Sequence, residues 1–214
     1  MIGVALLSGG LDSGVATACF VAEPGNQLRA AVFCDYGQRA RHREFAAAQA
    51  LAKRFAVELH RYELPWLADL SRTAGSRLLD GTGDLPTATA QAPGDEDSAQ
   101  AVWVPARNAV FVSIAAAAAE ALHAHCVVTG FNREEAATFP DNSQAFLTAA
   151  SAFLQLGTRS GMQVVSPTIT WDKDEIVAAA QRLGFTQDDF WSCYGGTTVP
   201  CGQCESCVRS RWQR

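Results

Sequence analysis

The stretch that decides the fold is Ile2-Gly3-Val4-Ala5-Leu6-Leu7-Ser8-Gly9-Gly10-Leu11-Asp12-Ser13. Residues 2–7 form a continuous apolar run, which is typical of a parallel strand buried on both faces. A glycine pair follows, and a helical pattern then runs from Leu11 to Val21. A strand, a glycine-rich turn and a helix in this order predict the first unit of an α/β fold, which binds its ligands at the carboxyl ends of the strands.

The same alternation continues along the chain and predicts a doubly wound parallel sheet with helices on both faces. Further strands are expected at 28–34, 57–62, 126–129 and 162–165, and further helices at 40–55, 106–125, 143–156 and 172–183. The pattern stops at about 71–101, where turn and acidic residues indicate either a functional loop or a disordered insertion. We therefore predict an α/β domain over 1–185, with this long loop, and a C-terminal segment over 186–214.

Composition narrows the class of protein. The 214 residues are 48% apolar, enough for a sizeable core, and 17 basic against 22 acidic residues give a net charge of -5. This charge argues against direct nucleic-acid binding, and the absence of an uninterrupted apolar run of roughly 18 residues argues against a membrane span. The odd number of cysteines and the lack of a signal-like start predict a cytoplasmic protein.

Residues 8–13 form a candidate phosphate-binding loop. Glycines let the backbone approach a ligand, and the free N–H groups at a helix start attract anions. The loop lacks the Gly-Lys-Ser/Thr of a Walker A motif, and the alternative is an ordinary glycine-rich turn. The hexapeptide resembles the pyrophosphate-binding loop of the PP-loop ATP pyrophosphatases. That resemblance implies cleavage of ATP between its α and β phosphates, with transfer of AMP to a substrate oxygen.

Four of the seven cysteines lie close together near the end of the sequence. Their spacing is C-x7-C-x2-C-x2-C, and they are Cys193, Cys201, Cys204 and Cys207. Four thiolates complete the tetrahedral shell of a structural Zn2+ ion. An iron-sulfur cluster, a redox pair or unrelated buried cysteines are the alternatives. The other three cysteines fall within predicted helices or strands and are interpreted as core residues.

Polar residues follow the second strand and open a later helix. Tyr36 and Gln38 are placed to contact a nucleotide, although a turn with a helix cap would also explain this region. Arg107 can bind a phosphate or carboxylate through two hydrogen bonds, with Asn108 beside it. The alternative for Arg107 is a surface arginine.

The fourth strand ends in Gly130, Phe131 and Asn132, and Phe139 and Asp141 follow shortly after. Across the crevice from the phosphate loop, this region is the natural place for a second substrate. An acidic loop with a helix cap is the alternative reading.

Taken together, the motifs resemble the QueC family of 7-cyano-7-deazaguanine synthases over nearly the whole chain. The resemblance rests on residues 8–13, 35–39, 104–108, 129–132, 140–141, 191–193 and 200–207. Many family members have Tyr-Pro-Asp-Cys-Arg where this chain has Phe139-Pro140-Asp141-Asn142-Ser143, a difference that bears on the substrate more than on the adenylation step.

The resemblance implies an adenine nucleotide α-hydrolase-like (PP-loop, Rossmann-like) fold and an ATP-dependent carbon–nitrogen ligase. The enzyme would convert 7-carboxy-7-deazaguanine and ammonia to 7-cyano-7-deazaguanine, a precursor of queuosine- and archaeosine-type tRNA bases, through adenylated intermediates. It would use ATP with Mg2+, hold a structural Zn2+, act on small molecules and form a homodimer.

The implied residue roles fall into four groups. The catalytic residues are Ser8, Asp12, Ser13 and Arg107; the nucleotide-binding residues are Ser8, Gly9, Gly10, Leu11, Asp12, Ser13, Tyr36, Gln38 and Gly130; the substrate-binding residues are Arg107, Asn108, Phe131, Asn132, Phe139 and Asp141; and the zinc ligands are the four clustered cysteines. Alternative functions are a ligase that passes the same acyl group to another amine, such as a protein amino terminus, another PP-loop amide ligase, a tRNA-modifying PP-loop enzyme, and a zinc-containing binding module.

Overall fold

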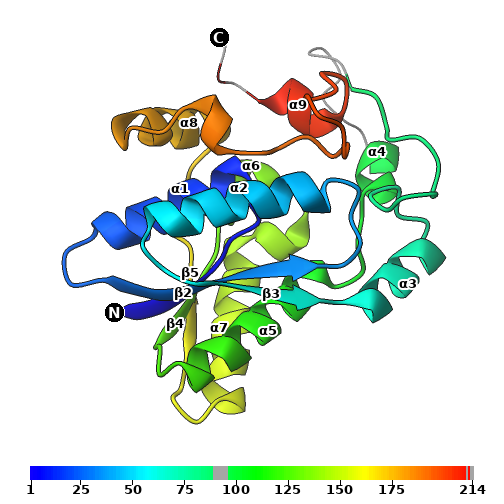
Figure 1. Cartoon of the computed structure of the whole chain (residues 1–214). Coiled ribbons are helices and arrows are strands. Elements are labelled where there is room, and N and C mark those ends of the chain that lie inside the picture. Colours follow the sequence, from blue (N-terminus) through cyan, green and yellow to red (C-terminus); the bar gives the residue numbers. More distant parts are fainter. Residues whose placement is uncertain (89–95, 211, 213–214) are drawn as a thin grey trace.

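The computed structural model describes residues 1–88, 96–210 and 212 (Figure 1). Its strands form one sheet in the order β3-β2-β1-β4-β5, and every neighbouring pair is parallel. The strands are β1 (Ile2–Leu6), β2 (Gln27–Asp35), β3 (Leu59–Glu63), β4 (Cys126–Val128) and β5 (Gln163–Val165). The predicted parallel α/β sheet is therefore confirmed.

Helices cover both faces of this sheet. On one face lie α1 (Leu11–Ala22), α2 (Arg41–Arg54) and α8 (Lys173–Arg182), and on the other α5 (Arg107–Ala121) and α7 (Gln144–Gly157) (Figure 1). Shorter elements are α3 (Pro65–Thr73), α4 (Glu96–Ala101), α6 (Arg133–Ala136), α9 (Glu205–Arg209) and the 3-10 turns η1 (Pro140–Asn142) and η2 (Gln187–Asp189). Among the described helices, none is long and apolar enough to cross a membrane.

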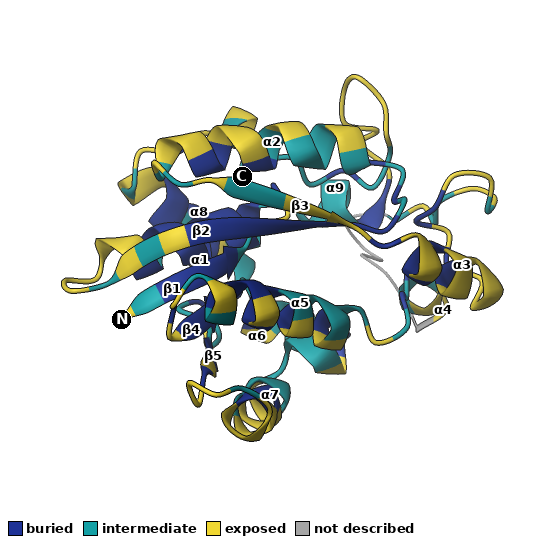
Figure 2. Ribbon diagram, turned by 60° about the horizontal axis from the view of Figure 1, so that its bottom comes forward, coloured by how far each residue is buried: buried dark blue, intermediate teal, exposed yellow. Residues whose placement is uncertain are grey.

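Strand β2 shows why the apolar runs are continuous. Its side chains alternate between two cores: Val32 and Cys34 pack with the α5 and α7 side, whereas Ala31 and Phe33 pack with the α1, α2 and α8 side. The second half of β2 is therefore buried on both faces (Figure 2). A strand buried on both faces needs apolar residues at every position rather than at alternate ones.

The stretch 71–101 is more ordered than its sequence pattern indicates. Helix α3 runs to Thr73, a short helix covers Glu96–Ala101, and isolated bridges join Leu79 to Gln38 and Thr87 to Cys204. Helix α3 begins with a proline and buries only a few of its nine residues, so its helical periodicity is too short to stand out. Residues 89–95 of the expected loop lie outside the described residues.

Helix ends agree with the sequence to within a few residues. The Asp172–Glu175 capping box at the start of α8 is present, with the Asp172 side chain accepting a hydrogen bond from Glu175 N at 3.0 Å. The residue Gly184, just past this helix, has a φ of +72°, which favours glycine at a helix end. Helix α5 begins at Arg107 rather than Ala106, because Ala106 has a left-handed φ of +51°.

Candidate active site

The candidate site lies where the strand order reverses between β1 and β4, the position at which open α/β sheets bind ligands. The phosphate loop follows β1, and Gly130 follows β4. A Cβ atom on Gly130 would lie 2.6 Å from the Ser13 backbone nitrogen and 2.7 Å from the Asp12 carbonyl carbon. Glycine at 130 therefore lets the end of β4 touch the start of α1.

The phosphate loop is closed by its two serines. The Ser13 hydroxyl accepts a hydrogen bond from Ser8 N at 3.2 Å and donates one to Gly10 O at 3.1 Å. The two hydroxyl oxygens are 3.0 Å apart. At Gly9 the φ is +82°, and a Cβ there would lie 2.2 Å from the Glu44 carbonyl oxygen. The loop conformation thus depends on glycine, and the N-cap residue of α1, Gly10, makes no side-chain cap.

A cavity of about 280 Å3 opens beside this loop. Its volume is close to the lower end of the range for small-molecule sites. Of the residues predicted to bind nucleotide or substrate, those that line it are Ser8, Gly10, Leu11, Asp12, Ser13, Tyr36, Gln38, Arg107, Asn108, Gly130 and Phe131. The fold thus gathers residues from the ends of three strands and the start of α5 around one space.

Four of the residues predicted to bind nucleotide or substrate do not line the cavity, among them Gly9, whose role in the loop is given above. Asn132 is fully buried and its Oδ1 accepts a hydrogen bond from Glu135 N at 3.0 Å, which caps α6. Phe139 is buried and stacks on Trp103, with ring centroids 6.3 Å apart. The Asp141 carbonyl accepts a hydrogen bond from the Asn108 side chain at 3.1 Å. Their roles in substrate binding stay predictions.

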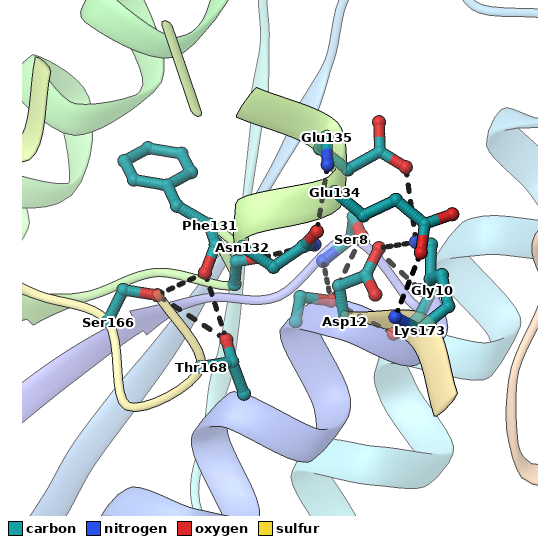
Figure 3. A network of polar contacts seen from close by, with 12 residues as sticks. Ser8, Gly10, Asp12, Phe131, Asn132, Glu134, Glu135, Ser166, Thr168 and Lys173 are labelled. Carbon is teal, nitrogen blue, oxygen red and sulfur yellow. Dashed lines mark hydrogen bonds and ion pairs between the residues drawn. The ribbon is translucent and has the colours of Figure 1, made fainter. Parts of the chain in front are cut away.

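Two buried hydroxyls fix the chain just after β4. The Ser166 and Thr168 hydroxyls both donate to the Phe131 carbonyl oxygen, at 2.8 and 3.0 Å (Figure 3). These bonds tie the segment that carries Gly130 and Phe131 to the chain following β5. The cavity wall at this point is consequently held by hydrogen bonds from side-chain hydroxyls to the backbone as well as by packing.

Lys173 is a site residue that the sequence reasoning missed. Its Nζ lies 2.5 Å from Asp12 Oδ2 and 3.2 Å from Glu135 Oε1 (Figure 3). The side chain lines the cavity and is only 11% exposed. Burial favours the neutral amine, but the two carboxylates outweigh it and raise the Lys173 pKa. The available signal was compositional, since Lys173 is one of two lysines beside fifteen arginines.

The two carboxylates that contact Lys173 differ in the direction of their pKa shifts. Burial raises the pKa of Asp12, against the attraction of Lys173. At Glu135, Lys173 and the more distant Arg209 and Arg107 outweigh burial and lower the pKa. Asp12 Oδ1 is buried, and no hydrogen-bond partner for it is found among the described residues. A buried carboxylate oxygen that has no such partner and lies beside a phosphate loop suits a hard cation such as Mg2+.

A second charged cluster lies on the β2 side of the cavity. Burial raises the pKa of Tyr36 to about 12. Burial opposes the charge of Arg107, but Tyr36 and Asp141 raise the Arg107 pKa. Burial also raises the pKa of Glu44 to about 7, although Gln38 Nε2 donates to Glu44 Oε2 at 2.8 Å. The cavity therefore holds a firmly charged cation and an acid that titrates near neutrality.

The four clustered cysteines converge as their spacing indicates. Their sulfur atoms all lie within 4.8 Å of one another, and the Sγ atoms of Cys201 and Cys207 are 3.9 Å apart. Tetrahedral Zn–S bonds of about 2.3 Å place sulfurs about 3.8 Å apart. Backbone N–H groups of Gly195 and Cys201 both donate to Cys193 Sγ at 3.3 Å. The set of donors and its geometry fit a closed metal site.

The segment after η2, residues 190–210, is here called the cysteine segment, and it touches the phosphate loop directly. Trp191 N donates to Gly9 O at 2.9 Å, and the Trp191 indole donates to Cys193 O at 2.9 Å. Near its other end, Gln203 O accepts a hydrogen bond from Ala88 N. This segment also contributes residues to which the sequence analysis gave no cavity role: Trp191, Ser192, Tyr194, Glu205, Ser206, Arg209 and Ser210.

Comparison with known proteins agrees with the family resemblance seen in the motifs. A family model described as "Queuosine biosynthesis protein QueC" matches residues 2–212. A protein from Pelotomaculum thermopropionicum named 7-cyano-7-deazaguanine synthase is 45% identical, with 98% of this chain and 94% of that protein covered. A protein of the same name from Desulforamulus reducens is 46% identical, with 98% and 91% covered.

A solved structure shares the fold at low identity. It is the U34-tRNA thiolase NcsA from Methanococcus maripaludis with its [4Fe-4S] cluster, which matches with a TM-score of 0.50 and 16% identity. The match covers 87% of this chain and 57% of that one. A family model matched over nearly the whole length, together with synthases more than 40% identical, shows that this chain is an enzyme of the QueC family.

Proposed function

We propose that this enzyme converts 7-carboxy-7-deazaguanine and ammonia to 7-cyano-7-deazaguanine at the expense of ATP, on the route to queuosine- and archaeosine-type tRNA bases. The names of its relatives support the product. The observation that carries the chemistry is the single cavity in which the phosphate loop, Lys173 and Arg107 meet. An anion-binding loop and two cations beside one space suit a reaction between a carboxylate and a triphosphate.

The reaction runs in two adenylation rounds. A carboxylate oxygen of the substrate attacks the α-phosphate, the bond to the β-phosphate breaks, and pyrophosphate leaves. Ammonia adds to the acyl carbon and expels AMP, which leaves the amide and one released proton. The amide oxygen then attacks the α-phosphate of a second ATP and expels pyrophosphate, and loss of AMP with two protons from nitrogen forms the nitrile. Both substrate oxygens thus end on AMP, and no external oxidant is needed.

The phosphate loop and its neighbours carry the charge of this chemistry. Residues 8–13 hold the phosphates through backbone N–H groups and the Ser8 and Ser13 hydroxyls. Lys173, which pairs with Asp12 and lines the cavity, would accompany the departing pyrophosphate. Mg2+, for which Asp12 is the proposed ligand, would neutralise phosphate charge. Tyr36, Gln38 and Gly130 form the nucleotide side of the cavity.

Arg107 is proposed to orient the substrate carboxylate against the α-phosphate, since a guanidinium binds a carboxylate through two parallel hydrogen bonds. Asn108 and Phe131 line the same wall and are proposed to contact the ring. Asn132, Phe139 and Asp141 stay predicted substrate contacts, and the Asp141 carbonyl also accepts a hydrogen bond from the Asn108 side chain. The rate gain then comes largely from positioning.

The proposed ion at Cys193, Cys201, Cys204 and Cys207 is Zn2+ in a structural role. Four thiolates leave no open coordination position for substrate. The alternative from the donor set is an iron-sulfur cluster. Residues 186–214 are proposed as the metal-binding segment and 1–185 as the nucleotide-binding domain, and the expected homodimer and cytoplasmic location stay predictions.

The proposal is tested with purified protein, ATP, Mg2+, ammonium and 7-carboxy-7-deazaguanine, followed by mass spectrometry. We expect the nitrile, with two AMP per product. AMP without amide or nitrile would favour the related ligase that passes the acyl group to another amine, such as a protein amino terminus. Absence of pyrophosphate release with any carboxylate would favour a binding module, and tRNA binding at physiological salt would favour a tRNA-modifying enzyme.

A further inference from the structure

The cysteine segment contributes a buried acid to the cavity wall. Glu205, in the first turn of α9, is only 4% exposed and lines the cavity. Its Oε1 lies 2.6 Å from Arg209 Nη2, one helical turn later, and Arg209 lines the cavity as well. Burying a carboxylate is costly unless charged or polar groups contact it. The proposed reaction steps give this pair no role.

The other acids on the cavity wall have hydrogen-bond or ion-pair partners on α8 or just after β2, outside the cysteine segment. Among the described residues that line the cavity, Asp12 and Glu135 are held by Lys173, and Glu44 accepts a hydrogen bond from Gln38. Glu205 instead comes from the cysteine segment. It lines the same cavity as Arg107 and Asn108, the residues proposed to contact the substrate.

The proposed substrate needs an acceptor at this kind of position. Its reactive carboxylate must lie at the phosphate loop, so the far edge of the fused ring points away from that loop. This edge carries two donors side by side, the ring N1–H and the exocyclic 2-amino group. Carboxylates accept hydrogen bonds only and can receive two parallel donors. The ion pair to Arg209 fixes the orientation of such an acceptor.

We propose that the Glu205 carboxylate accepts hydrogen bonds from N1–H and the 2-amino group of a guanine-type base, and that Arg209 is a positioning residue for it. This inference rests on the proposed function and deepens it, because it assigns base recognition to the cysteine segment. The closed metal site next to the cavity would then fix the position of α9 and, with it, of the Glu205 carboxylate that binds the base.

The test compares two substrates on two proteins. The substrates are 7-carboxy-7-deazaguanine and the analogue without the 2-amino group, and the proteins are the wild type and E205Q. Hydrogen bonds to a charged acceptor are worth about 10- to 100-fold. We expect wild type to prefer the amino compound by about that factor in kcat/KM for pyrophosphate release. In E205Q the preference shrinks to a few-fold, while the KM for ATP and the zinc content stay unchanged.

Two further variants separate recognition from folding. E205D keeps the charge for Arg209 but withdraws the acceptor by one methylene, so we expect an intermediate preference even if E205Q does not fold. E23Q, at an exposed residue beyond α1, is the matched control and keeps the full preference. If E205Q or E205D retains the wild-type preference, the inference is overturned while the function stands. If the wild type turns over neither compound, the proposed function itself has failed.

Discussion

Replacing Gly130 with alanine should separate the two halves of the candidate active site. A Cβ atom there would sit 2.6 to 2.7 Å from three backbone atoms of Asp12 and Ser13. Ordinary van der Waals contact begins at about 3.5 Å between carbons, so the end of β4 and the start of α1 must move apart by about 0.8 Å. Backbone atoms cannot turn aside as a flexible side chain would, so the phosphate loop itself is displaced.

Two effects of different size follow for G130A. Overpacking of a well-packed contact costs about 1–3 kcal/mol in the free energy of unfolding. Misplacement of reacting groups by about 1 Å costs on the order of 100-fold in rate, so we expect kcat/KM for pyrophosphate release to fall roughly 30- to 100-fold. Activity should therefore drop far more than the fraction of folded protein, which remains close to one.

The assay pairs steady-state pyrophosphate release with urea unfolding, and G157A serves as the matched control. Gly157 ends α7, and a Cβ there meets nothing nearer than Phe153 Cζ at 4.0 Å. Alanine at 157 should leave activity unchanged and alter stability by less than about 1 kcal/mol. A G130A enzyme within twofold of wild-type kcat/KM would refute the inference that close contact at Gly130 sets the phosphate-loop position.

The remaining predictions concern charge and metal. K173M leaves two carboxylates facing each other, so we expect the free energy of unfolding in urea to fall by about 1–4 kcal/mol, between the values for surface and buried pairs, and pyrophosphate release to be lost. The control K53M, at an exposed lysine, should change neither. A stable, active K173M would contradict the assigned role. Burial raises the Glu44 pKa from 4.5 to about 7, so the folded state binds the proton more tightly, and the wild type should lose stability relative to E44Q as pH rises from about 4.5 to about 7; an equal pH dependence of the two urea midpoints would count against this. Metal analysis should find one zinc per chain that C204S loses and C19S keeps, with activity falling in step because the cysteine segment is bonded to the phosphate loop; bound iron with visible absorbance would favour the cluster instead.

Local patterns explain why much of the architecture could be predicted. Continuous apolar runs of four to six residues indicate strands buried on both faces, and the Asp172–Glu175 capping box and Gly184 mark the ends of α8 within its own sequence. The phosphate loop and the cysteine spacing are likewise short-range signals. Helix α3 escaped notice because it is only nine residues long and runs into the turn-rich stretch that follows it.

The roles of single side chains near the site were harder to predict from the sequence. Asn132 and Phe139 lie in the region predicted for a second substrate, but Asn132 caps α6 and Phe139 stacks in the core. A side chain after a strand can turn toward a cavity or back into the protein, and the choice depends on neighbours that are distant in sequence. Arg107 shows the opposite outcome, since Tyr36 and Asp141 hold this potential surface arginine beside the cavity.

By itself, the sequence determined the parallel α/β fold, the place of the phosphate loop at the end of β1 and the four cysteines that converge. Each depends on residues close together along the chain. Only the tertiary structure decided that Lys173 reaches Asp12 across 161 positions, and that the cysteine segment forms a wall of the cavity with Glu205 and Arg209. These contacts arise from the order of strands and the path of the last residues over the carboxyl edge of the sheet, and no local pattern encodes them.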